Sequence, residues 1–112
     1  MNGPAYKPPV THAAAVIDMG FSSYKPAAIT IHAGETVEWR NTALIAHTVM
    51  DDPKLAKKAG GSLLPEGAAA FNSGRIPPGQ IYTHRFTAPG IYRYVCQYHG
   101  SHGMVGIVSV ER

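Results

Sequence analysis

From residue 27 onward, short apolar runs alternate with Gly, Pro and Asn breaks about every ten residues, a spacing typical of all-β sandwiches and barrels. Within the run ETVEWR, a period of two places Val37 and Trp39 on one face and leaves Glu38 and Arg40 for solvent. Seven or eight strands are expected. Those that can be bounded are residues 13–19, 27–32, 35–40, 47–50, 80–87, 90–96 and 104–111.

One segment departs from this strand pattern. In DDPKLAKKAG, Asp52 can act as an N-cap, Pro53 fits the first helical position, and Gly60 can end the helix. Lysines near the end of the segment complement the helix dipole. We therefore expect one short helix, or a helical turn, inside a long connection.

The length of 112 residues suits a single domain, for which residues 1–12 would be an N-terminal tail or linker. Residues 1–10 lack the basic start and apolar core of a signal peptide, and we interpret the chain as an exported domain shown without its leader. Ten Lys and Arg against seven Asp and Glu give a net charge of +3. That charge is mild for nucleic-acid binding and favours a negatively charged protein partner.

The one cysteine lies in GIYRYVCQYHG, where period-two alternation places Cys96 at the end of a strand. His99 and Met104 follow it on one tight loop, and His47 starts a strand upstream. A thiolate, two imidazoles and a thioether suit copper, whereas zinc does not select Met and hard cations require carboxylates. His102 lies in the same loop and could compete with His99; we interpret it as an exposed loop residue.

The order of these landmarks resembles the small blue copper proteins, the cupredoxins of the plastocyanin, pseudoazurin and amicyanin type. The matching stretches are GETVEWRN, FNSG, PPGQ, APGIYRYVC and the Cys-x2-His-x4-Met loop. The resemblance implies an eight-stranded Greek-key β-sandwich and one type 1 copper ion. It also implies that His47, Cys96 and His99 are strong ligands and Met104 the axial one.

By the same resemblance the protein is an electron carrier and not an enzyme. Tyr92 occupies the position of a tyrosine corner, in which a phenol ties a connection to the following strand. Thr48 replaces the Asn that usually follows the first histidine, and Ala46 replaces a frequent Pro. Hydrogen bonding around the thiolate tunes the potential, so a family potential should not be transferred to this chain.

Redox proteins such as c-type cytochromes, oxidases or reductases are the partners this resemblance implies, met through an acidic surface on the partner. We expect a monomer in an extracytoplasmic compartment, the bacterial periplasm. Three alternatives stay open: a copper module of a larger membrane-bound or multicopper redox enzyme, a copper delivery protein, and a metal-free interaction domain. The full-length gene, metal exchange with chelators and metal analysis would discriminate them.

Overall fold

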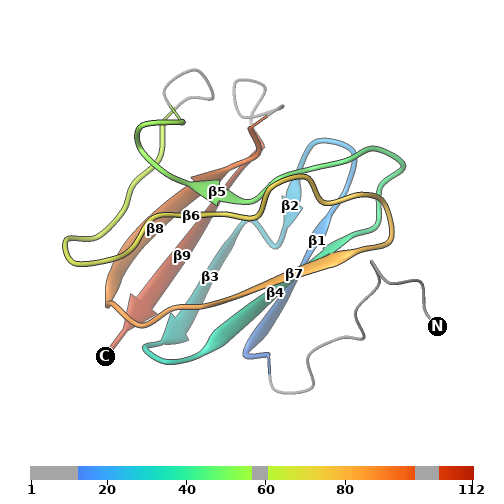
Figure 1. The fold of residues 1–112 in the computed structure, drawn as a ribbon. Coiled ribbons are helices and arrows are strands. Elements are labelled where there is room, and N and C mark those ends of the chain that lie inside the picture. Colours follow the sequence, from blue (N-terminus) through green and yellow to red (C-terminus); the bar gives the residue numbers. More distant parts are fainter. Residues whose placement is uncertain (1–12, 57–60, 98–103) are drawn as a thin grey trace.

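The structure, a computed structural model, describes residues 13–56, 61–97 and 104–112, which form two facing β-sheets (Figure 1). No helix occurs within these ranges. The nine strands are β1 (Ala15–Met19), β2 (Tyr24–Lys25), β3 (Ala28–His32), β4 (Thr36–Asn41), β5 (Met50–Asp51), β6 (Phe71–Asn72), β7 (Ile81–Arg85), β8 (Gly90–Val95) and β9 (Val105–Glu111). The expected β-sandwich is confirmed. The strand expected at residues 47–50 is the two-residue β5, which shares only Met50 with that range, whereas β2 and β6, also of two residues, were not expected.

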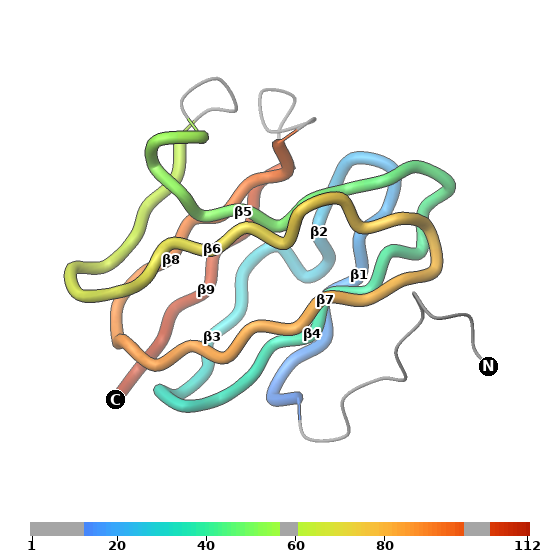
Figure 2. The backbone as a smooth tube through the Cα atoms, in the orientation of Figure 1, coloured from blue at the N-terminus to red at the C-terminus, as the bar shows by residue number. Residues whose placement is uncertain are grey.

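The strands are ordered β2-β1-β4-β7 in one sheet and β3-β9-β8-β5-β6 in the other. β1 runs parallel to β4 and β3 parallel to β9, whereas the remaining pairs are antiparallel. Figure 2 shows that the end of β8, the start of β9 and the turn between β1 and β2 lie at the same end of the molecule. Residues far apart in the sequence can therefore meet at this end.

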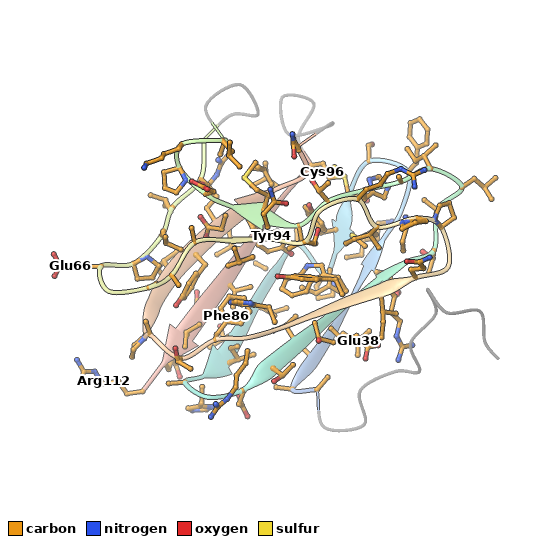
Figure 3. All side chains as sticks on the ribbon, in the orientation of Figure 1. Glu38, Glu66, Phe86, Tyr94, Cys96 and Arg112 are labelled. Carbon is orange, nitrogen blue, oxygen red and sulfur yellow. The ribbon has the colours of Figure 1, made fainter. Side chains whose placement is uncertain are left out.

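Aromatic side chains fill the space between the sheets, as the period-two pattern of the strands predicts. Trp39 of β4 and Tyr94 of β8 pack edge to face with ring centroids 5.4 Å apart. Tyr94 also meets Tyr24 of β2, at 4.6 Å. Figure 3 shows Tyr94 and Phe86 between the sheets and Cys96 close to one end of the sandwich. The aromatic core thus leads from the middle of the fold to the cysteine.

The expectation for Glu38 was wrong. Glu38 lies in β4 between β1 and β7, where Val16 and Thr83 are its neighbours in register, and its side chain is fully buried. The guanidinium of Arg40 lies over it, with Nε 2.5 Å from Oε2 of the carboxylate. A charge-assisted pair stabilises this carboxylate on a central strand, whereas period-two reasoning had assigned it to solvent.

Residues 52–56, the start of the segment expected to form a short helix or a helical turn, form a turn. The backbone N–H groups of Leu55 and Ala56 both donate to the carbonyl of Asp52, and the Asp52 carboxylate accepts from the N–H of Lys54. Asp52 thus makes the cap-like contact that its sequence position indicates, without a helix behind it in the described part. Residues 57–60 lie outside the described residues. No helix in the described ranges is long and apolar enough to cross a membrane.

The tyrosine corner is present. The phenol of Tyr92 in β8 donates to the carbonyl of Ala88 at 2.6 Å. This bond ties the turn before β8 to the strand itself, which fixes the start of the strand that leads to Cys96. The prediction for Tyr92 is therefore confirmed.

Candidate metal centre

His47 lies between β4 and β5 on a backbone held from two sides. It forms an isolated antiparallel bridge with Ile76, in which each N–H donates to the other residue's carbonyl, at 3.1 and 2.8 Å. The side-chain amide of Asn41 donates to the carbonyls of Ile45 and Ile76, both at 2.9 Å. The loop that carries His47 is therefore fixed to the opposite connection before any metal is considered.

The ring of His47 is fully buried and its two nitrogens have different surroundings. Nε2 lies 2.6 Å from the carbonyl oxygen of Gly20. Because a carbonyl can only accept, this contact places the proton on Nε2 and leaves the lone pair on Nδ1. Nδ1 faces the Sγ of Cys96 at 3.7 Å. A metal-ligating histidine is commonly oriented by such a bond on its other nitrogen.

Cys96 follows the last residue of β8 and its thiol is fully buried. Its backbone N–H donates to the carbonyl of Met104 at 3.1 Å, which closes the base of the loop between β8 and β9. Met104 is fully buried in the same hydrophobic cluster as Cys96. The structure therefore brings His47, Cys96 and Met104 to one end of the core, as the sequence predicts.

Thr48 adds a hydroxyl to this centre. Its Oγ1 accepts a hydrogen bond from the N–H of Gln97 at 2.7 Å and lies 3.8 Å from the Cys96 sulfur. Its carbonyl accepts from the phenol of Tyr24 at 2.6 Å. Burial raises the pKa of Tyr24 well above its ordinary value, and the nearby Cys96 and Tyr94 raise it further. Tyr24 therefore stays protonated and remains a donor to Thr48.

The donor set fits a soft or borderline transition metal. At zinc sites the metal lies about 2.0 Å from nitrogen and about 2.3 Å from sulfur. An ion of similar size could therefore contact both Nδ1 of His47 and Sγ of Cys96, which lie 3.7 Å apart. The thiol and the thioether favour copper over hard cations. No group of three or more His, Cys, Asp or Glu side chains suited to a metal occurs within residues 13–56, 61–97 and 104–112. His99 and His102 lie outside these described residues.

Sequence reasoning missed the groups that orient the predicted ligands. Gly20 contributes a backbone carbonyl, so its residue type carries no signal for this role. Tyr24 and Asn41 act through hydrogen bonds that their side chains donate to backbone carbonyls. Of these two residues, only Asn41 carries a sequence signal, because Asn at the end of a strand is typical of a turn. Finding these contacts requires knowing which loops meet at this end of the sandwich.

Comparison with known proteins agrees with this centre. A family model described as copper binding proteins, plastocyanin/azurin family, matches residues 11–111. The plastocyanin of Scenedesmus fuscus is 33% identical over 98 residues, which cover 84% of this chain and 92% of that protein. The chloroplastic plastocyanin of Tetradesmus obliquus is 36% identical over 94 residues, again 84% of this chain but 62% of its own length.

Solved structures show the same architecture. A mutant amicyanin in its reduced state superposes with a TM-score of 0.71 and 29% identity, over 91% of this chain and 86% of that one. A purple cupredoxin from Nitrosopumilus maritimus superposes with a TM-score of 0.64 and 27% identity, over 87% of this chain and 99% of that one. The fold and the donor set define a copper-binding β-sandwich of the cupredoxin class.

The chain belongs to the plastocyanin/azurin family of copper-binding proteins. It is an electron-transfer protein with one type 1 copper ion as its cofactor, and not an enzyme.

Proposed function

We propose that His47, Cys96, His99 and Met104 hold the copper ion, with Met104 as the weak axial ligand. The observation that carries this assignment is the 3.7 Å separation between Nδ1 of His47 and Sγ of Cys96, with Nε2 bonded to Gly20. His99 supplies the remaining strong ligand, since it follows Cys96 by three positions in the loop that leads to Met104. Copper bound there supplies a one-electron couple.

The residues around the centre hold its ligands in one arrangement. Asn41 and the Ile76 bridge fix the His47 backbone, and the Met104 carbonyl fixes the N–H of Cys96. A site whose ligands cannot move changes little between oxidation states, which favours fast electron exchange. Burial of His47 means that it cannot itself meet a partner, so we assign that contact to the side of His99.

Exposed apolar side chains next to the centre support a docking face for redox proteins. Phe21 follows Gly20 in the β1–β2 turn and is 78% exposed, and Leu44 in the loop before His47 is 96% exposed. Weak redox encounters use small interfaces, for which a few apolar residues suffice. The net charge of +3 favours partners with an acidic surface, such as c-type cytochromes, oxidases or reductases.

The setting we propose is that of an exported carrier. The chain would act as a single copper domain with residues 1–12 as tail or linker, as a monomer, in an extracytoplasmic compartment such as the bacterial periplasm. The match of the family description to residues 11–111 supports one domain.

Spectroscopy of the copper-loaded chain tests the ligand assignment. The oxidised protein is expected to show an intense visible band from thiolate-to-copper charge transfer, and Cys96→Ser is expected to abolish it because a serine oxygen cannot supply that transition. A Cys96→Ser protein that keeps the band would contradict the proposal.

Two matched pairs of histidine variants serve as controls. His99→Ala should lose the band, whereas His102→Ala in the same loop should keep it. His47→Ala should also lose it, whereas His32→Ala, at an exposed position in β3, should not. Loss of the band in His102→Ala with retention in His99→Ala would reassign the ligand within the loop.

A further inference from the structure

The outer face of the sheet that contains β4 carries a fully buried side chain, that of Glu38. Val37, Glu38 and Trp39 follow one another in β4, and all three are buried completely. Because neighbouring residues of a strand point to opposite faces, a strand buried at three consecutive positions is covered on both sides. The aromatic core covers the side of Val37 and Trp39. A second cover therefore lies over Glu38, on the side away from the core.

The described neighbours of Glu38 supply only part of this cover. Val16 and Thr83, its partners in register, project from the same face, and both are partly open to solvent. Arg40 approaches the carboxylate from one side, and its own side chain is 40% exposed. Neighbours that are open to solvent themselves do not account for a carboxylate with no exposed surface.

Three segments lie outside the described residues, and one of them adjoins this face. Residues 57–60 belong to the connection between β5 and β6, and residues 98–103 to the loop between β8 and β9. All four of those strands are in the other sheet. Residues 1–12, in contrast, lead directly into β1, the strand beside β4.

The point where residues 1–12 join the fold is close to Glu38. The N–H of Ala14 donates to the carbonyl of Thr36 at 2.8 Å, at the start of β4. Glu38 lies two residues beyond Thr36, which is about 7 Å along a strand. Twelve residues span up to about 40 Å when extended. The segment is therefore long enough to turn back and cross the outer face of β1, β4 and β7.

The composition of residues 1–12 suits this face. The segment, MNGPAYKPPVTH, contains one lysine, three prolines and no carboxylate. The face carries the carboxylates of Asp18 and Glu38, with Arg40 in register with Asp18. The positive charge of Lys7 complements these carboxylates. Proline has no N–H, so it leaves no donor unpaired where it packs on a sheet whose own backbone groups are already paired.

We propose that residues 1–12 fold back over the outer face of β1, β4 and β7 and enclose the Glu38 carboxylate. The tail is then part of the folded domain and not a free linker. The family description matches residues 11–111, so this contact belongs to this chain beyond the region it shares with the family. It does not depend on which residues hold copper.

A double-mutant cycle in the copper-loaded chain tests the contact. Urea unfolding is measured for the parent, for Glu38→Gln, for the chain without residues 2–10, and for the two changes combined. The effect of Glu38→Gln on the folding equilibrium constant should differ by at least about twofold with and without the tail, because residues in contact do not act additively. Glu66→Gln, at an exposed position far from Glu38 in Figure 3, is the control and should be additive with the truncation.

NMR of the reduced full chain provides a second measurement that needs no variant. The methyl groups of Val16 and Thr83 should show nuclear Overhauser effects to protons of residues 1–12, and their absence would overturn the proposal. If the truncated chain does not fold, this measurement decides alone.

Additive effects of Glu38→Gln and the truncation would also overturn the proposal. A coupling that appears only at high protein concentration would assign the face to a second copy of the chain, against the proposal. A parent chain without the visible band would instead overturn the proposed function and leave this contact unaffected.

Discussion

Asp51 is a carboxyl group enclosed by the protein without a hydrogen-bond partner among the described residues. It lies in β5 opposite Phe71, and burial raises its pKa from 3.8 to about 7. Two neighbours act on the Asp51 carboxyl in opposite directions. The Ser62 hydroxyl lowers its pKa, although the two groups lack hydrogen-bond geometry, and the charge of Asp52 raises it. Burial raises the pKa of Tyr92 in β8, and the nearby Asp51 carboxylate raises it further. Near neutral pH this group gains or loses a proton inside the core.

The free energy of unfolding should therefore fall as the pH rises from about 4 to about 7, because the folded state binds the Asp51 proton more tightly than the unfolded chain does. Asp51→Asn cannot titrate and should flatten that part of the profile. Urea unfolding between pH 4 and 8, as a difference between variant and parent, measures the effect. Asp18→Asn, at an exposed position of β1, is the control. Parallel profiles for Asp51→Asn and the parent would contradict the assignment.

Residue patterns indicated where the proposed ligands lie in the fold better than they indicated the surroundings of these residues. Cys96 and Met104 could be placed because strand alternation and loop spacing are local properties of the chain. Glu38 could not, because its burial depends on Arg40 lying over it and on strands that pair with β4 from distant parts of the sequence. The Gly20 carbonyl is a further case, since it meets a ring 27 positions away.

At the scale of elements, β8 and β9 form the hairpin that carries Cys96 and leads from Met104. Its register places Tyr94 opposite Gly106, and the Tyr94 ring occupies the space that a side chain at 106 would fill. Tyr94 in turn is confined by Trp39 and Tyr24. The absence of a side chain at 106 therefore lets the aromatic core reach the strand beside the cysteine loop.

Gly106→Ala should be destabilising, because the added methyl group would overlap the Tyr94 ring and neither Trp39 nor Tyr24 leaves it room to move. Overpacking of this kind typically costs about 1–3 kcal/mol. Thermal or urea unfolding of the metal-free chain measures the change. Gly20→Ala is the matched control, since the nearest atom to its added methyl group, Ser23 Oγ, lies 3.8 Å away. Equal stability of the two variants would count against this packing argument.

Long strands with clear alternation were predictable to within one or two residues, as for β3 and β9. The strands β2 and β6 were not, because two residues have no period, and the strand expected at residues 47–50 is the shorter and displaced β5. Of the two expectations for residues 52–60, a short helix or a helical turn, the described residues up to Ala56 agree with the turn, because the capping residues suit both. Residues 57–60 lie outside the described residues. Local propensity alone could not decide between the two.

At the scale of the whole molecule, the proposed centre joins segments about fifty positions apart. His47 precedes β5, whereas Cys96 and Met104 flank the β8–β9 hairpin loop. A metal that binds all of them binds the folded chain and not the unfolded one, so binding and folding are linked.

Copper should raise the midpoint of thermal unfolding. At a free concentration 100 times the Kd, the folded state gains about 2.7 kcal/mol. Differential scanning calorimetry with and without copper measures the shift, and removal of the metal by a chelator should reverse it. Cys96→Ser, which lacks the proposed thiolate ligand, should show a much smaller shift. An equal shift in Cys96→Ser would place the stabilising metal elsewhere.

The bond between His47 and Gly20 means that the length of one turn matters more than its residue types. Gly20 contributes through its main chain, and the N–H of Gly20 donates to the carbonyl of Ser23 in a turn whose ends are fixed by the pairs Met19–Tyr24 and Asp18–Lys25. Substitutions there leave the carbonyl in place. An insertion or deletion would carry it away from the imidazole, so this contact constrains the length of the turn at residues 20–23 and not the side chains that the turn carries.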